Sequence, residues 1–404
     1  MQKSETINAR ILLESPETVF ARSCKDEADW HTVLIKRRGN SSDWFDKKQF
    51  KIEVVDKDGK DKEISLAGLP ENSEFALHSS YVDRSFMRNA FIYRLGRKVG
   101  EERGERWAAP RTVYLELVLN GQYNGLYVLV ETVGRDKNRV DLPKLDQSNF
   151  ANFSYILEVS AADGYLSSDK GTRFRNVYPS RKKIEELKDV NLLLHNLVVE
   201  TMNRDLNGFE KALASKNFKD PERGYRPFVN LDSFVDYFII QEVMKNLDGF
   251  RRSMYFHKDQ GKLVMGPIWD FDLALGNLRF YGMERYKGWV HRDLYVVYPS
   301  VIWFRRMMED PYFKAQVKVR YQKLRKPGGL LDPDTIVAEI EQLNTELGMA
   351  PERDQCRWVG TRNFIEEHFM KTKETSSTHD GNVDIMKRWF FMRLGWLDRK
   401  IAKF

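Results

Sequence analysis

The chain has 404 residues, of which 42% are hydrophobic and 31% are charged, and its formal net charge is +7. This size and composition exclude a disordered or fibrous protein and predict one large domain or two modest ones. The positive charge is too dilute for the basic stripe of a nucleic-acid-binding protein, so anionic small molecules fit it better than DNA. With only Cys24 and Cys356 present, a disulfide framework is excluded, and whether the two pair stays open.

The first residues, MQKSETINARILLESPETVF, do not show a basic region followed by an apolar one, as a signal peptide would. No apolar run approaches the length of a membrane-spanning helix. We therefore expect a soluble chain with no membrane span. It is either cytoplasmic, or secreted with its signal peptide absent from this sequence.

The first predicted strands lie within residues 31–55. The segments HTVLIKRRG and KQFKIEVVD alternate in polarity, and the polar turn GNSSDWFDKK lies between them. The backbone amides of such a turn can cover phosphate while a strand lysine reaches it, but a solvated hairpin with surface lysines explains the pattern equally well. Alternation places Lys47 and Lys51 on one face and Lys48 on the other, and we favour Lys48 as the lysine in a cleft.

A helix and a second hairpin follow in the same part of the chain. Apolar residues recur at helical spacing over residues 83–100, and Asp83 is placed to cap this helix. Residues 111–133 predict two strands joined through Asn120-Gly121, a dipeptide that suits a tight turn. The next segment is polar and contains proline, which predicts a connection between two parts of the chain.

The remaining residues, 134–404, are predicted to be mostly helical. Residues 231–246 carry apolar side chains almost all round their helix, which predicts a deeply buried element. This helix leads into the region 248–277, where SMYFHKD and KLVMGPIW predict a hairpin around the turn QG. Preceded by a β-rich lobe over residues 1–133, this order predicts an α+β protein with a divergent bilobal protein-kinase-like fold.

Acidic residues flank the hairpin of this second half on both sides. Pairing of its strands brings Asp248 and Asp270 near each other at its open end. Phosphoryl transfer from ATP requires carboxylates that hold Mg²⁺ and an acid near the attacking hydroxyl. Ser253 stands where protein kinases carry a metal-binding asparagine, and DFD at Asp270–Asp272 resembles their D-F-G motif. Taken alone, Asp248-Gly249 is explained equally well as a turn dipeptide.

These residues form a candidate site for a metal and a nucleotide. Asp270, Asp272 and Ser253 are the candidate ligands of Mg²⁺ or Mn²⁺, and Asp248 is the candidate catalytic acid. The histidines are scattered without ligand spacing, which argues against a zinc site. The sequence contains no G-x-S-x-G or similar nucleophile motif.

Five blocks of sequence carry a resemblance to a known family. In chain order, within roughly residues 30–280, they are IKRRGNSSDWFDKKQFKIEV, YVDRSFMRNAFIYRLG, NGQYNGLYVLVETV, NLDGFRRSMYFHKD and KLVMGPIWDFDLALGN. With these blocks the chain resembles the CotH kinase family, atypical protein kinases named for a bacterial spore coat protein. The later helices resemble the C-terminal region of that family more loosely.

The resemblance implies a divergent kinase fold that binds ATP with Mg²⁺ and phosphorylates Ser or Thr of a partner protein. By motif position it implies that Asp248 is the catalytic-loop acid and Asp270 the metal-binding acid. It places the adenine against a hinge in LVETV, with backbone groups near Glu131 and Val133. It makes Lys48 the lysine that contacts phosphate.

Two other functions stay open, and the acceptor protein is not identified by the sequence. Some members of the family act as surface adhesins or invasins, so a non-catalytic adhesion or assembly module is one alternative. Transfer of AMP to a protein hydroxyl is the other. Arg88 and Asn89 either orient phosphate or hold their helix on the sheet, and we favour the structural role. Glu158 is a candidate partner for a buried basic group.

Overall fold

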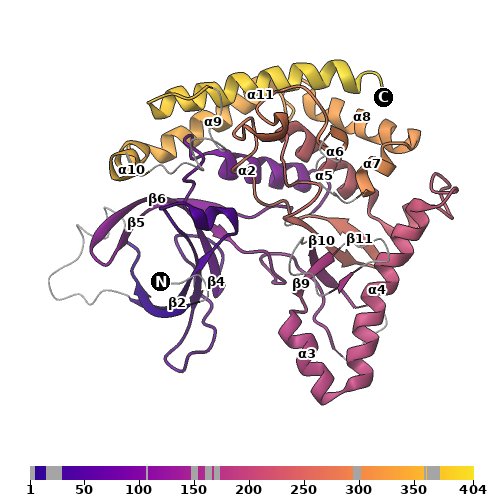
Figure 1. The fold of residues 1–404 in the computed structure, drawn as a ribbon, viewed down its shortest axis with the longest axis horizontal. Helices are drawn as coiled ribbons and strands as arrows, with labels where there is room; N and C mark the ends of the chain where they lie inside the picture. The colour runs from indigo at the N-terminus through magenta and orange to yellow at the C-terminus, as the bar shows by residue number, and fades with distance from the viewer. Residues whose placement is uncertain are drawn as a thin grey trace.

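The computed structural model describes residues 5–14, 30–105, 108–146, 153–159, 166–167, 173–293, 302–358, 361 and 374–404. In this part of the chain, Figure 1 shows two sheets beneath a layer of helices. The first sheet comes from the N-terminal part of the chain, and the second sheet and most helices come from the rest. The α+β class and the bilobal arrangement predicted from the sequence are confirmed.

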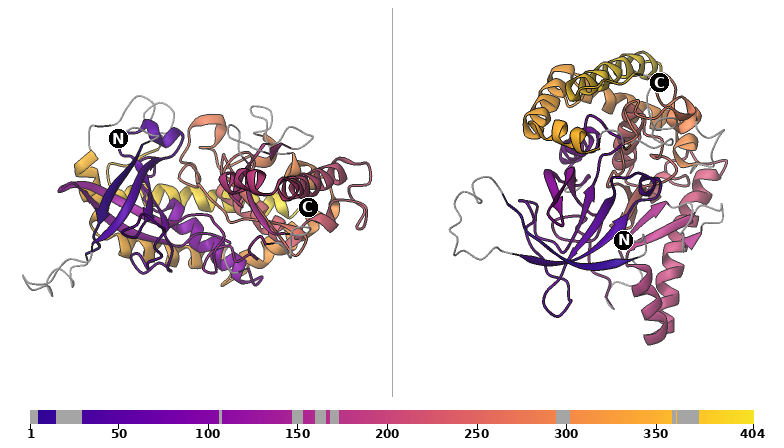
Figure 2. Two further views of the ribbon diagram at one scale, coloured as in Figure 1. Left: turned by 90° about the horizontal axis from the view of Figure 1, so that it is seen from below. Right: turned by 60° about the vertical axis from the view of Figure 1, so that its left-hand side comes forward.

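The first sheet has six antiparallel strands in the order β1-β2-β3-β4-β6-β5. Their bounds are β1 Thr6–Ile11, β2 His31–Arg38, β3 Gln49–Val54, β4 Glu74–His78, β5 Thr112–Leu119 and β6 Gln122–Glu131. Figure 2 shows that this sheet is strongly curled. Alternate residues of β3, namely Phe50, Ile52 and Val54, are buried in the apolar core that the curl encloses.

Two sequence predictions are confirmed in this sheet. The segments around the polar turn form the antiparallel pair β2 and β3, in which Arg38 lies opposite Gln49. Strands β5 and β6 form the second hairpin, whose turn residues Asn120 and Gly121 both have positive φ. Asparagine and glycine tolerate this backbone region best, which explains how the dipeptide determines the turn.

The second sheet has five antiparallel strands in the order β11-β10-β7-β9-β8. Their bounds are β7 Tyr155–Val159, β8 Leu166–Ser167, β9 Arg173–Tyr178, β10 Met254–Asp259 and β11 Lys262–Met265. The hairpin of β10 and β11 is the one predicted from the sequence, and Phe256 pairs with Met265 at its open end. The other three strands were not predicted, because a run as short as YILEV does not distinguish a buried strand from a helix segment.

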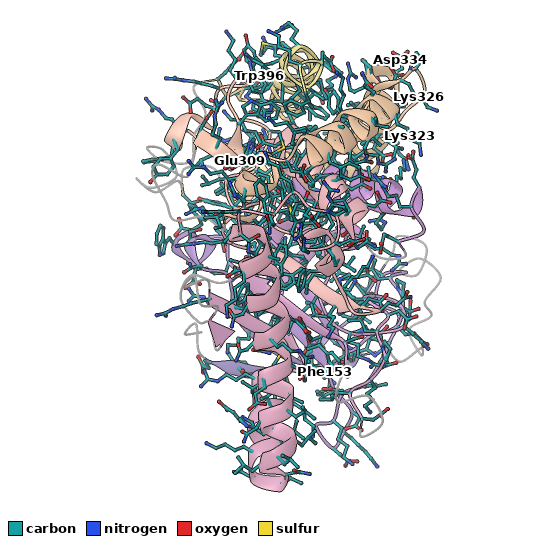
Figure 3. All side chains as sticks on the ribbon, turned by 90° about the vertical axis from the view of Figure 1, so that its right-hand side faces the viewer. Phe153, Glu309, Lys323, Lys326, Asp334 and Trp396 are labelled. Carbon is teal, nitrogen blue, oxygen red and sulfur yellow. The ribbon has the colours of Figure 1, made fainter. Side chains whose placement is uncertain are left out.

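Most of the helices form the upper layer in Figure 1, whereas α3 and α4 lie below it. The bounds of the helices are α2 Arg88–Glu101, α3 Arg181–Val190, α4 Leu192–Ala214, α5 Leu231–Met244, α6 Val290–Asp293, α7 Trp303–Met307, α8 Pro311–Arg325, α9 Pro333–Leu347, α10 Ala350–Trp358 and α11 His379–Ile401, with 3₁₀ turns at Ser41–Trp44, Arg226–Phe228 and Phe280–Gly282. Helix α5 is buried on nearly its whole surface, as predicted, and packs against α2, α8 and β11. Figure 3 labels Trp396 on α11, the topmost helix of this layer, where its side chain is buried and packs on Trp289.

Helix α2 begins later than predicted. The side chain of Asp83 accepts hydrogen bonds from the backbone N–H groups of Ser85 and Arg88, so it organises a turn that leads into the helix. Phe86 within this turn has a φ of 56°, which a helix does not allow. The helix therefore starts at Arg88 and packs against α5 and α9 in the helical layer.

Helices α3 and α4 project from the body of the molecule as a pair (Figure 1). The two helices are separated at Asn191, whose side chain accepts a hydrogen bond from the N–H of Leu194. Among the helices that the structure describes, none combines the length and the apolar composition needed to cross a membrane.

Candidate active site

A cavity of about 580 Å³ lies where one end of the first sheet meets the open end of the β10–β11 hairpin. Its size is within the range of small-molecule sites. Asp248, Ser253, Asp270 and Asp272 all line it, so the structure brings together the four acidic and hydroxyl residues singled out in the sequence. The turn after β2 contributes another part of the lining, from Arg38 to Ser42.

The side chain of Asn246 links the two acidic segments. Its Nδ2 donates a hydrogen bond to the backbone oxygen of Asp270 at 3.1 Å, and its Oδ1 accepts one from the N–H of Asp248 at 3.2 Å. Ser253 adds a second link, because its Oγ donates to Oδ2 of Asp270 at 3.0 Å. Asp248 and Asp270 are therefore held close together by these side chains as well as by the pairing of β10 with β11.

Helix α2 fixes the DFD segment from behind. The N–H of Asp270 donates to the hydroxyl of Tyr93 at 3.1 Å, and the N–H of Phe271 donates to Oδ1 of Asn89 at 2.8 Å. Arg88 forms a buried ion pair with Asp83, and its Nε donates a hydrogen bond to the backbone oxygen of Ala274. Arg88 and Asn89 thus have a structural role, but they hold the backbone that carries the acids, whereas we expected them to hold their helix on the sheet.

Burial and mutual repulsion make the acidic part of the cavity a favourable place for a cation. Burial, followed by the negative charge of Asp248, raises the pKa of Asp270 to about 6. Burial, followed by the charge of Asp270, raises the pKa of Asp272 well above its ordinary value. A divalent ion would relieve this repulsion, and two carboxylates with a hydroxyl are a donor set suited to Mg²⁺.

This donor set is incomplete without a ligand. Within the described part of the chain, no group of three or more His, Cys, Asp or Glu side chains is arranged to hold a metal ion by itself. Mg²⁺ in proteins is commonly held by one or two carboxylates together with substrate phosphates and several waters. The arrangement of Asp270 and Asp272 fits a metal that arrives with a phosphorylated ligand.

The basic side of the cavity begins with Arg38 at the end of β2. Burial lowers the pKa of His78 well below its ordinary value, so the neutral ring can accept a hydrogen bond from Arg38, whose Nη1 lies 2.7 Å from Nε2. The guanidinium also lies over the ring of Trp269, 5.4 Å from its centre. These contacts orient a cation in the same cavity as Asp270, with which it interacts electrostatically.

The turn after Arg38 depends on a glycine. Gly39 has a φ of +104°, and a Cβ at this position would lie 1.9 Å from the Oγ of Ser42. A side chain here would displace the turn and with it the backbone that lines the cavity. The sequence suggested that the backbone amides of this turn cover phosphate, and the turn lines the cavity where they could do so.

Two more arginines line the cavity, and neither was singled out in the sequence. Arg175 of β9 forms an ion pair with Glu158 of β7, which lies opposite it in the strand register. Arg252 lies in the loop between Asp248 and Ser253. The RR pair before Gly39 is a signal that could have identified Arg38, whereas Arg175 joins the site only through the unpredicted sheet.

The structure places the predicted lysine and the predicted hinge outside the lining of this cavity. Among the described residues that line the cavity, Lys48, Glu131 and Val133 do not occur. Lys48 donates from Nζ to the backbone oxygens of Asp43 at 2.9 Å and Phe45 at 2.5 Å, so it braces the turn from inside. Glu131 is buried and accepts from the backbone N–H of Arg111 at 2.7 Å, and Val133 packs in a small apolar cluster.

The remaining two lysines of this region are also engaged. Lys51 forms an ion pair with Glu74 at 2.6 Å on the surface of the first sheet. Lys47 is fully buried and forms an ion pair with Asp354 of α10. The exposed Cys356 lies on the same helix, and Cys24 lies outside the described residues.

The sheets, the helical layer and the cavity define a bilobal α+β protein with paired acids in its site. A family model described as CotH kinase protein matches residues 35–397, nearly the whole chain. The chain therefore belongs to the CotH kinase family, and its class is that of a kinase-type transferase. The comparison with curated proteins gives no match.

Proposed function

We propose that the protein is an atypical kinase that uses ATP with Mg²⁺ or Mn²⁺ to phosphorylate Ser or Thr of a partner protein. One observation carries the proposal: Asp248 and Asp270 line the same cavity and are joined through Asn246. Membership of the family supports a kinase-type activity. We also propose that residues 1–133 and 134–404 act as the two lobes.

Asp270, Asp272 and Ser253 are the residues that would hold the metal. A divalent ion at these residues would neutralise charge on the phosphates of the nucleotide. The raised pKa values of Asp270 and Asp272 support this role, because both carboxyls are buried beside negative charge. Ser253 already donates to Asp270 and so orients one of its carboxylate oxygens.

Asp248 would act on the acceptor. It would accept a hydrogen bond from the attacking hydroxyl, orient its oxygen toward the terminal phosphorus and receive the proton as the new P–O bond forms. The bond between that phosphorus and the oxygen bridging to the β-phosphate breaks, and ADP leaves. Nη2 of Arg251 lies 2.8 Å from Oδ1 of Asp248, and this ion pair holds the carboxylate in place.

The nucleotide phosphates would lie against the turn after β2. Arg38 is our choice for the cation that contacts them, because it lines the cavity and is oriented by His78 and Trp269. Lys48 would contribute by bracing this turn, through its bonds to Asp43 and Phe45. Backbone groups near Glu131 and Val133 remain our prediction for the adenine.

The test combines binding with transfer. Saturating MgATP at a hundred times its dissociation constant should stabilise the protein by about 2.7 kcal/mol, seen as a thermal shift. Labelled ATP should then transfer phosphate to a protein acceptor, and Asp270→Ala should abolish that transfer. Asp259→Ala is the matched control, because Asp259 lies at the closed end of the same hairpin and outside the cavity lining.

Three outcomes would contradict the proposal. Full transfer by Asp270→Ala would defeat the assignment of the metal site. No thermal shift with millimolar MgATP would favour a non-catalytic adhesion or assembly module. Intact-mass analysis that finds an adduct of about 329 Da rather than about 80 Da would identify transfer of AMP instead of phosphate.

A further inference from the structure

A helix from the C-terminal half of the chain lies across the first sheet, close to the turn that lines the cavity. This helix is α10, and it packs along β6 (Figure 1). Between the two lies the ion pair of Lys47 and Asp354, in which the lysine side chain is 0% exposed. Lys47 directly follows the residues 39–46 that form the turn.

The pair is built into the backbone of β6. Lys47 donates from Nζ to Oδ1 of Asp354 and to the backbone oxygen of Leu126, the latter at 2.5 Å. The N–H of Leu126 donates to the same carboxylate oxygen at 2.8 Å. The preceding Gly125 has a φ of +102°, and a Cβ there would lie 2.2 Å from Asp354 Oδ1. The glycine therefore permits the close approach of helix, lysine and strand.

Aromatic side chains connect the same turn to α10 on a second path. Phe45 lines the cavity, and its ring centre lies 5.5 Å from that of Tyr81. Tyr81 in turn meets Trp358 of α10 edge-on at 6.1 Å. The indole of Trp358 donates to the backbone oxygen of Asn124 at 3.0 Å, which fixes the helix on β6. Two independent contacts thus tie the turn to one helix.

Stability alone does not account for the ion pair. Burial lowers the pKa of Lys47 to about 8 in spite of the attraction to Asp354, and burial raises the pKa of Asp354 in spite of the lysine. For both groups the cost of leaving water is the largest contribution. Buried ion pairs of this kind can often be replaced by apolar residues without loss of stability. A role in fixing the position of the turn relative to α10 and β6 explains the pair better.

We propose that Lys47 and Asp354 are positioning residues, which hold the turn of residues 39–46 over the nucleotide phosphates and make nucleotide affinity depend on the seating of α10. Neither residue lines the cavity. They act through Phe45 and the backbone of the turn. The inference rests on the proposed function for its ligand, but the restraint on the turn is a property of the protein alone.

The experiment uses the full chain with the double substitution Lys47→Met and Asp354→Asn. The asparagine keeps an acceptor for the N–H of Leu126, and no unpaired charge is left buried. We expect KM for ATP to rise about tenfold while kcat changes less than about twofold, since a displaced turn weakens binding. Without nucleotide, the amides of Asp43 and Phe45, which bond to Asn40 and Ser42, should exchange hydrogen faster.

The matched control is Arg353→Ala. Arg353 lies next to Asp354 on α10 and forms an ion pair with Glu116 of β5, but its side chain is 53% exposed. Exposed pairs contribute little, so this variant should keep the wild-type KM and the wild-type exchange rates. A comparable change in the control would show that any disturbance of α10 has the same effect, and would overturn the role of the buried pair.

Failure of the inference and failure of the proposed function give different results. Wild-type protein that shows no thermal shift with MgATP would refute the nucleotide site, while hydrogen exchange would still report on the turn. Wild-type protein that binds MgATP, with a double variant of unchanged KM and unchanged exchange, would overturn the inference alone. A double variant whose kcat falls by as much as its KM rises would show that the pair supports the fold in general, and this result would also overturn the inference. If the double variant does not melt cooperatively, the single variant Asp354→Asn replaces it, and the same three quantities are measured: KM for ATP, kcat and the hydrogen exchange of the turn.

Discussion

The acidic and basic parts of the cavity are assembled in different ways. The acids Asp248, Asp270 and Asp272 lie in the loops on either side of one hairpin, so they are close in the sequence. The basic residues Arg38 and Arg175 come from different sheets, and only the fold brings them to the same cavity. A short segment can thus encode the candidate metal site, whereas the residues around it require the whole architecture.

The two parts also differ in how firmly they are held. Asn89, Tyr93 and Asn246 bind the backbone around Asp270 from buried positions in or next to the helical layer. The turn after Arg38 is braced mainly by side chains within it or beside it, such as Lys48, and by α10. We therefore expect substitutions among the acids to change the chemical step and substitutions on the basic side to change binding.

The largest expected effect is that of Asp248→Asn. If Asp248 orients the acceptor hydroxyl and accepts its proton, kcat should fall about 10²- to 10⁴-fold, the usual contribution of a general acid or base. Binding of MgATP should change little, because the residue acts on the acceptor side. Single-turnover transfer and a thermal shift with MgATP measure the two effects on the same preparation.

A matched substitution on the same hairpin sharpens this test. Asp259→Asn removes a carboxylate from the closed end of the hairpin, outside the cavity lining, and should leave both measurements unchanged. If Asp248→Asn instead weakened MgATP binding as much as transfer, the separation between acidic chemistry and basic binding would break down.

The next largest effect concerns stability, and its sign is opposite to that of a typical damaging mutation. The pKa of Asp270 is raised from 3.8 to about 6, so the folded protein retains a proton that the unfolded chain releases. Wild-type stability is therefore lowered as the pH rises through this window. At pH 7 without metal, Asp270→Asn should be more stable by up to about 3 kcal/mol, since one pKa unit corresponds to about 1.4 kcal/mol.

Denaturant unfolding of both proteins between pH 4 and pH 7 measures this difference. It should nearly vanish at pH 4, where the wild-type carboxyl is protonated, and it should reverse with saturating MgATP, which stabilises only the wild type. A variant less stable than the wild type at pH 7 would show that Asp270 is held in an attractive environment, contrary to the electrostatics of the acidic part.

Much of the fold around the site could be predicted from local signals. The buried helix α5, the β10–β11 hairpin and the Asn120-Gly121 turn each follow from a pattern within one short segment. The four candidate site residues from Asp248 to Asp272 also share one segment, and hairpin pairing predicts their proximity. The other three strands of the second sheet could not be predicted, because a strand as short as β7 does not carry a period of its own.

Alternation along the predicted strand sorted the three lysines into two faces, but β3 begins only at Gln49, and alternation could not show what each lysine contacts. Lys47 pairs with Asp354, which lies 307 positions later in the chain, and no nearby residue signals that contact. Lys48 bonds to its own turn. Arg38 enters the cavity because the register of β2 and β3 places it beside Gln49, and such register is a property of the assembled sheet.

Arg38→Gln is the smallest of the three expected effects, and it tests the basic side directly. Loss of one charge-assisted hydrogen bond costs about 1.5–3 kcal/mol, so the dissociation constant for MgATP should rise about tenfold to a hundredfold. Turnover at saturating ATP should remain near wild type, in contrast to Asp248→Asn. Lys36→Gln, on the exposed surface of the same strand, is the control. Unchanged affinity for Arg38→Gln would mean that the phosphates lie away from the turn, which would leave the acidic residues as the main determinants of nucleotide binding.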